Sequence, residues 1–253
     1  MADGIALTGF IVAAFLFTLL WGRILWYFDE KSKRINRLVF YLMTFTRLTF
    51  PEIKSLVLSL IYYVFGVTGM LIFSMAYRID LLKLFTFKFH FFPLILLGII
   101  AEITLSIFST HIYLKSVQGK RVNPFAEIHE APWINGILKL PRALVPIAPV
   151  LGGLMEEIFF RGILLVILVT QLSISPMISI LMVTGLFLVE QWIQLRTLAQ
   201  RIMIGLGSFS ISFIGGILVI YTGSIIPAAI AHMSFVIFYF GYSFKTSSGY
   251  SFK

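Results

Sequence analysis

The chain has 253 residues, of which 59% are hydrophobic and 12% are charged, and its mean hydropathy is +0.97. Soluble globular chains carry about 25% charged and about 45–50% apolar residues, so the composition excludes a soluble globular protein and indicates a polytopic membrane protein. The 20 Lys and Arg residues outnumber the 11 Asp and Glu residues, but they fall in short loops beside apolar runs, which indicates orientation signals and lipid anchors, with a lipid bilayer and no nucleic acid as partner.

Seven apolar runs are long enough to cross a hydrocarbon core of ~30 Å as helices of about 20 residues. In chain order they cover residues 4–27, 55–77, 91–114, 144–170, 175–195, 202–221 and 225–242. The first run has no basic stretch before it and no small-residue cleavage site after it, so we expect a retained helix and not a signal peptide. The segment "LVFYLMTFTRLTF" between the first two runs is too short to count as a span, and we expect it to lie in the membrane interface.

These runs predict an all-α fold, a polytopic transmembrane bundle of about seven helices (six to eight), with an active-site-like cavity between the helices of the C-terminal half. We see no internal repeat or linker, so we expect a single membrane domain over residues 1–253. Basic residues gather in the first, third and fifth loops and in the tail, which seven helices would place on one side of the membrane. Because positive charge marks the cytoplasmic side, we predict an outside N-terminus and a cytoplasmic C-terminus.

Three charged residues interrupt the apolar stretch "GGLMEEIFFRGILL", namely Glu156, Glu157 and Arg161. A charge at the bilayer centre costs about 2.5–3.5 kcal/mol, so these residues need partners. On an α-helix Glu157 and Arg161 share one face and can form an ion pair. Glu156 points about 100° away from Glu157, and a carboxylate without a partner in its own helix suits a general base that activates a water. The alternative is that all three are polar contacts between helices.

The same stretch resembles the CAAX prenyl protease type 2 family, also called the CAAX protease and bacteriocin-processing (Abi) family of intramembrane glutamate proteases. "EEIFFRG" matches its EExxxR motif, and "FLVEQ" matches FxxxH with Phe187 in place and Gln191 in the histidine position. "GSIIPAAIAHMSFV" matches the last motif with His232, while Val236 stands where that family has Asn or Asp. The resemblance implies a protease-like core over residues 144–243, preceded by family-variable helices and cytoplasmic loops over residues 1–143.

The resemblance also implies a role for each matched residue. Glu156 would be the base that activates water, Glu157 and Arg161 would brace it, and His232 would donate a hydrogen bond to the oxyanion. Gln191 stands where the water should be oriented beside Glu156. It can donate and accept hydrogen bonds but cannot take up a proton near neutral pH.

Two further carboxylates have open interpretations. Glu190, next to Gln191, is either a compensating base or a charge that reaches the interface. It and Phe187 are our secondary candidates for the site. Glu102, within the third apolar run, is a candidate partner for Arg23 or Arg161.

A metal centre is not predicted. A catalytic zinc needs three protein ligands, mostly His with Asp, Glu or Cys, whereas this core offers His232 and two carboxylates, one of them apparently paired with Arg161, and the chain has no Cys. His129 lies between Glu127 and Glu130, and we interpret it as a solvated loop histidine. We therefore expect neither a metal nor another cofactor.

Two classes of function follow. The resemblance implies a metal-independent intramembrane endopeptidase of a bacterial cytoplasmic membrane, in which a glutamate-activated water hydrolyses a peptide bond of a membrane-associated peptide or protein. The changes at Gln191 and Val236 leave an alternative, a catalytically impaired relative that binds a membrane partner in self-immunity or peptide maturation. A proton-coupled transporter is less well supported, because no inverted repeat is visible.

Overall fold

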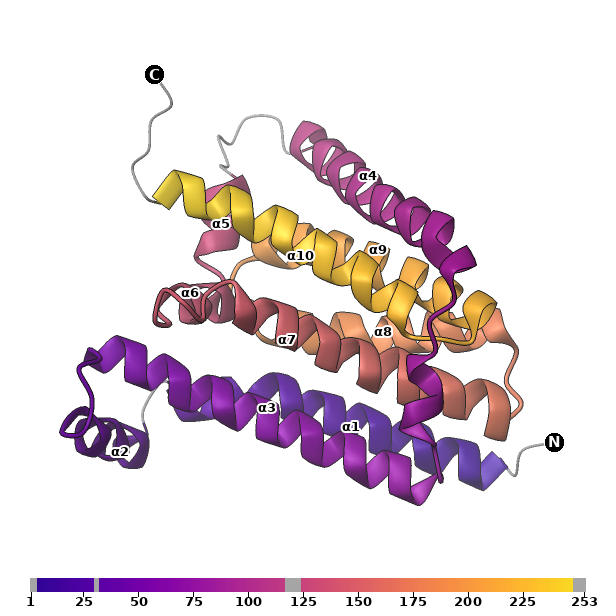
Figure 1. The fold of residues 1–253 in the computed structure, drawn as a ribbon, viewed down its shortest axis with the longest axis horizontal. Helices are drawn as coiled ribbons and strands as arrows, with labels where there is room; N and C mark the ends of the chain where they lie inside the picture. The colour runs from indigo at the N-terminus through magenta and orange to yellow at the C-terminus, as the bar shows by residue number, and fades with distance from the viewer. Residues whose placement is uncertain (1–3, 30–31, 117–123, 248–253) are drawn as a thin grey trace.

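The structure, a computed structural model, describes residues 4–29, 32–116 and 124–247, and every regular element in these ranges is a helix (Figure 1). The predicted all-α polytopic bundle is confirmed. The first elements are α1 (Gly4–Asp29), α2 (Lys33–Met43), α3 (Phe50–Ala76), η1 (Leu81–Phe85), η2 (Phe89–Phe91), α4 (Phe92–Ser116), α5 (Pro124–His129) and α6 (Pro132–Leu138). They are followed by α7 (Ile147–Glu156), η3 (Glu157–Leu165), η4 (Ile167–Gln171), α8 (Pro176–Ile193), α9 (Leu198–Thr222) and α10 (Ile226–Ser247).

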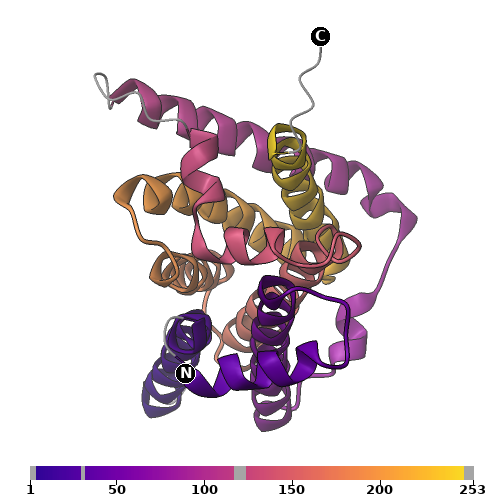
Figure 2. The same cartoon turned by 90° about the vertical axis from the view of Figure 1, so that its left-hand side faces the viewer.

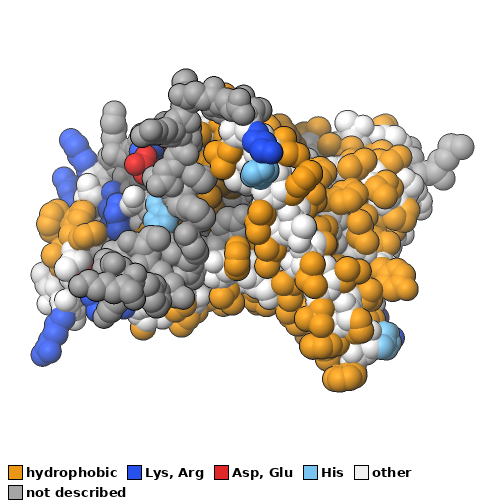
Figure 3. All heavy atoms as spheres, turned by 90° about the horizontal axis from the view of Figure 1, so that it is seen from above, with side chains coloured by type: hydrophobic (Ala, Val, Ile, Leu, Met, Phe, Trp, Pro, Cys, Tyr) orange, Lys and Arg blue, Asp and Glu red, His pale blue; other side chains and the backbone are white. Residues whose placement is uncertain are grey.

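All seven predicted runs are helical. Within the described residues, five helices are long and apolar enough to cross a membrane, and they cover Gly4–Ile24, Phe50–Ala76, Phe89–Lys115, Pro176–Ile193 and Leu198–Thr222. The fourth predicted run is divided among α7, η3 and η4, and the last is α10, whose apolar part is Ile226–Phe238. Large apolar side chains cover the outside of the bundle, as expected for contact with lipid (Figure 3).

Helix α2 is too short to span a membrane, as predicted. Its N-terminus is capped by Ser32, whose side chain accepts a hydrogen bond from the amide of Ile35. Ile35 and Val39 pack against Ile53 of α3. Viewed along the long helices, α2 lies across their ends (Figure 2). This orientation supports the prediction of an interfacial helix, because such a helix lies in the plane of the membrane surface.

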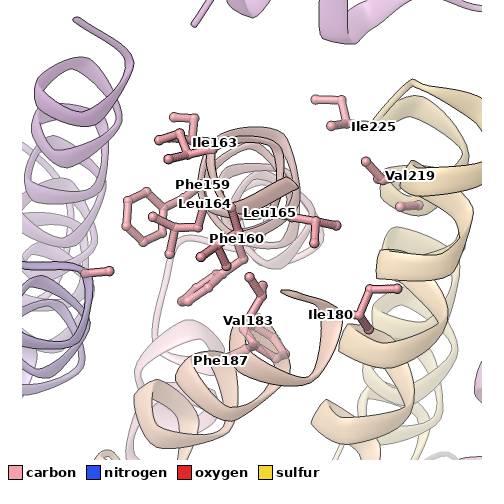
Figure 4. Packing of buried hydrophobic residues seen from close by; sticks show 14 of the residues in the cluster. Phe159, Phe160, Ile163, Leu164, Leu165, Ile180, Val183, Phe187, Val219 and Ile225 are labelled. Atoms are coloured by element: carbon pink, nitrogen blue, oxygen red, sulfur yellow. The ribbon is translucent and has the colours of Figure 1, made fainter. Parts of the chain in front are cut away.

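The helix formed by α7, η3 and η4 lies in the middle of the bundle. Five apolar side chains of η3 are completely buried, namely Phe159, Phe160, Ile163, Leu164 and Leu165 (Figure 4). A helix that is apolar on all sides is typically surrounded by other helices. The sequence predicted an α-helix here, whereas η3 and η4 are π-helices. Hydrogen bonds from residue i to i+5 widen the helix, and such segments are frequent at functional sites.

The approach to α10 is held by backbone geometry and by a contact with η1. Gly223 ends α9 with a positive φ of 67°, a left-handed conformation that glycine adopts without a steric penalty. The hydroxyl of Ser224 and the amide of Ile225 both donate hydrogen bonds to the carbonyl oxygen of Leu84. These contacts fix where α10 starts, and therefore where His232 lies two turns later.

The helices alternate in direction. Helices α2, α5 and α6 lie at one end of the bundle, and the start of α1 and the turn before α10 lie at the other (Figure 1). Lys and Arg side chains gather at the α2 end (Figure 3). Lys31, Lys120, Arg121 and Lys253 also contribute to the predicted orientation but lie outside the described residues.

This arrangement leads to a prediction about topology. A reporter fused after the last residue is expected to be cytoplasmic, and one inserted in the turn at residues 222–224 is expected to be external, because positive loops stay inside. Alkaline phosphatase and fluorescent-protein fusions would measure both positions. The opposite pattern would show that the orientation is inverted.

Candidate active site

Glu157, Arg161 and His232 form a buried charged cluster. The Nη1 atom of Arg161 lies 3.1 Å from Oε1 of Glu157, so the predicted ion pair is confirmed. The Nδ1 atom of His232 lies 2.9 Å from the same oxygen. Arg161 and Glu157 are close enough for an ion pair, but the guanidinium nitrogens of Arg161 make no hydrogen bond within the described part of the chain. The guanidinium carbon instead lies 4.5 Å from the ring centroid of Phe187, a cation–π distance.

The contact with Glu157 determines what the His232 ring can do. An ionised carboxylate only accepts hydrogen bonds, so Nδ1 of His232 carries the proton that it donates to Glu157. The other ring nitrogen, Nε2, points toward Glu156 and lies 3.8 Å from its Oε2 atom. Glu157 therefore holds the imidazole in place, and Arg161 in turn holds Glu157.

Glu156 takes its partners from other helices. The hydroxyl of Tyr62 on α3 lies 3.3 Å from Oε1 of Glu156, and Nε2 of Gln191 on α8 lies 3.2 Å from the same oxygen. The other oxygen, Oε2, faces His232. The carboxylate is thus anchored through one oxygen, and the second oxygen lies beside the histidine.

A cavity of about 930 Å³ reaches these residues. Glu156, Phe187, Gln191, His232 and Val236 all belong to its wall. Further wall residues come from α1, α3, α4, α5, α6, α7, α9 and α10, and the wall is mostly apolar. Small-molecule and peptide pockets typically have volumes of about 300–1,000 Å³ with a few polar groups in an apolar wall. Glu157 and Arg161 are completely buried behind this wall.

The third loop contributes to the same cavity through its two short helices. Ile128, Glu130, Trp133 and Asn135 belong to the cavity wall near the α2 end of the bundle. The hydroxyl of Thr197 donates to the carboxylate of Glu127, at 2.9 Å, which ties α5 to the start of α9.

Glu190 does not reach the membrane interface, which was one of its two interpretations. Its side chain is completely buried, so a charge that reaches the interface is wrong. Nε2 of Gln191 donates to it at 2.8 Å and Nε2 of Gln194 at 2.6 Å. The hydroxyl of Tyr62 lies 3.3 Å from its Oε1 atom.

Sequence reasoning missed Tyr62. The signal was the pair of tyrosines in "IYYVFG", because a hydroxyl in an apolar span needs a hydrogen-bond partner. The second of them, Tyr63, donates to the carbonyl oxygen of Ala148 at 2.7 Å. Both tyrosines therefore connect α3 to α7.

Two other expectations concern isolated ionisable residues. Glu102 is completely buried, and within the described residues it forms neither a hydrogen bond nor an ion pair with Arg23 or Arg161. His129 is not the expected solvated loop histidine, because it is half-buried at the end of α5 and its Nε2 atom is buried without a hydrogen-bond partner in the described ranges. No group of three or more His, Cys, Asp and Glu residues that could hold a metal occurs among the residues that the structure describes.

A family model matches the part of the chain that carries most of this site. Residues 139–238 match the family model described as type II CAAX prenyl endopeptidase Rce1-like. The resemblance predicted from the three motifs is therefore confirmed, and the match contains Glu156, Glu157, Arg161, Gln191 and His232. No curated protein and no solved structure matches the chain.

Proposed function

We propose that the chain is an intramembrane endopeptidase acting on a membrane-associated peptide or protein, supported by the match of residues 139–238 to the type II CAAX prenyl endopeptidase Rce1-like family model. The observation that carries this proposal is the position of Glu156 in the wall of a cavity of about 930 Å³, beside Gln191 and His232. A base, a water-orienting group and a potential oxyanion donor thus face one space inside the bundle.

The proposed reaction is a hydrolysis with Glu156 as general base. The free oxygen of Glu156 takes a proton from a water, and the water oxygen attacks the carbonyl carbon of the peptide bond. Because Nδ1 of His232 is engaged with Glu157, donation from Nε2 to the oxyanion requires the imidazolium form, in which both ring nitrogens carry a proton. Glu156 then passes its proton to the leaving nitrogen as the C–N bond breaks. A positioned acid or base of this kind contributes about 10²–10⁴-fold.

Gln191 would orient the attacking water by a hydrogen bond. It leaves proton transfer to Glu156, because an amide neither gains nor loses a proton near neutral pH. The mostly apolar cavity wall supports a substrate that approaches from the bilayer. Each step proposed here uses only water and the side chains of Glu156, Gln191 and His232.

A binding function is the alternative, and one observation favours it. Val236 belongs to the cavity wall, one helical turn after His232, in the position where the resembling motif has a polar residue. The site therefore lacks a hydrogen-bonding group that a peptidase would use on the substrate. A non-catalytic relative would bind a membrane partner in the same cavity.

The purified protein, reconstituted in liposomes with a library of membrane-associated peptides, tests the two functions. A peptidase is expected to release defined fragments, which mass spectrometry would identify. A binding protein would retain peptides uncleaved. Retention without fragments across the library would overturn the peptidase proposal.

A further inference from the structure

Two buried carboxyl groups face the same tyrosine hydroxyl. The hydroxyl oxygen of Tyr62 lies 3.3 Å from Oε1 of Glu156 and 3.3 Å from Oε1 of Glu190. A phenol has one proton, so it donates to one carboxylate at a time. If both glutamates were ionised, one carboxylate would face a lone pair of the tyrosine oxygen.

The amide of Gln191 connects the same two groups. Its Nε2 atom lies 3.2 Å from Glu156 and 2.8 Å from Glu190, so its two N–H groups reach both carboxyl groups. Gln194 adds a donor to Glu190 at 2.6 Å. The pair is therefore bridged twice, once by a hydroxyl and once by an amide.

The charges around the pair are uneven. His232 on α10 lies 3.8 Å from Glu156, and Arg161 on η3 lies behind it, stacked on Phe187. None of the ion pairs between described residues involves Glu190. Helix α1 approaches Glu190 through Gly22, and the adjacent Arg23 is exposed. On α9, Arg201 donates to the carbonyl oxygen of Leu195.

We infer that Glu190 is a positioning residue that shares one proton with Glu156 through the hydroxyl of Tyr62. In the resting site Glu190 is the protonated partner and donates to the tyrosine oxygen, while Tyr62 donates to the ionised Glu156. The Tyr62 hydroxyl then donates one hydrogen bond and accepts another, and like charges at close distance are avoided. The amide of Gln191 cannot carry a proton between the two groups, whereas the adjacent Glu190 supplies a proton-carrying group at this point of the helix.

The consequence for the proposed peptidase is that Glu156 is kept ionised and oriented. This part of the inference depends on the proposed function. When Glu156 takes the proton from water, the Tyr62 hydroxyl stays between the two carboxyl groups, and Glu190 keeps its own proton. The proton on Glu156 is then the one that leaves with the amine. The carboxyl pair itself is independent of catalysis.

Infrared spectroscopy of the purified protein tests the pair without any activity. The wild-type protein at neutral pH is expected to show the C=O stretching band of a protonated carboxyl group, and Glu190→Gln is expected to lose it. Glu102→Gln is the matched control, because it removes another completely buried carboxyl group and identifies that group's own band. If Glu190→Gln retains every carboxyl band of the wild type, Glu190 is ionised and the inference is overturned.

Tyr62→Phe gives a second readout in case Glu190→Gln does not fold. Loss of the hydroxyl should shift the Glu190 band without removing it, and an unshifted band would contradict the shared proton. If cleavage is found, the wild-type rate should fall at high pH as the shared proton is lost, and Glu190→Gln should lack this fall. Cleavage with the same pH profile in both proteins would overturn the positioning role but leave the peptidase standing. If Glu190→Gln loses the band and no cleavage is found, the carboxyl pair is supported and the peptidase proposal fails.

Discussion

Replacing Arg161 by alanine is expected to lower the free energy of unfolding by about 3–5 kcal/mol, because it leaves a buried carboxylate without its cation. Arg161 is completely buried, and its Nη1 atom lies 3.1 Å from Glu157. The substitution also removes the guanidinium that lies over the Phe187 ring. His232, held by the same oxygen of Glu157, is the remaining partner of that carboxylate. Thermal and denaturant unfolding in detergent would measure the loss.

Glu156→Gln is the matched comparison for Arg161→Ala. It keeps the shape of the side chain, and the buried ion pair between Glu157 and Arg161 stays intact. We expect a much smaller change in stability than for Arg161→Ala. Equal shifts of the unfolding temperature in the two variants would argue against the buried pair as a stabilising unit.

Replacing Gln191 by histidine is expected to raise the cleavage rate by up to about 10²–10⁴-fold, the contribution typical of a positioned acid or base. The amide of Gln191 lies 3.2 Å from Glu156 and belongs to the cavity wall. An imidazole at this position could share or take the water's proton, which the amide cannot do. Rates of fragment release by the variant and the wild type would be compared in the same liposomes.

Two further variants make this result interpretable. Val236→Asn added to Gln191→His restores a polar group one turn after His232, and Glu156→Gln in the same background should abolish the gained activity. If the double variant Gln191→His with Val236→Asn cleaves nothing while the protein still binds a membrane partner, the peptidase proposal fails and the binding function stands.

The helices were predictable from the sequence because each apolar run is long compared with the thickness of a membrane. Helix type in the fourth run was not predictable. Phe159, Phe160 and Ile163 would be equally apolar in an α-helix or a π-helix, so the hydrophobic pattern does not distinguish the two. The division of this run into α7, η3 and η4 is also why it is not among the five long apolar helices.

Contacts within one helix of the site were predictable, and contacts between helices were not. The spacing of Glu157 and Arg161 predicted their ion pair. The contact of His232 with Glu157 joins two helices, and the sequence did not predict it. Tyr62 lies 94 residues before Glu156 along the chain, and no pattern in the sequence relates the two positions. Glu190 was noticed as a carboxylate next to Gln191, but its burial depends on how α8 packs against α1 and η3, which local spacing does not reveal.

The most direct test of the central claim, that Glu156 activates water for hydrolysis, is a comparison of Glu156→Gln with Glu102→Gln in the peptide cleavage assay. Both variants replace a buried carboxyl group by an amide of the same shape, but only Glu156 belongs to the cavity wall. Glu102→Gln is expected to cleave at the wild-type rate, and Glu156→Gln is expected to be slower by at least about 10²-fold. Cleavage by Glu156→Gln at the wild-type rate would contradict the claim, because another group would then have to activate the water.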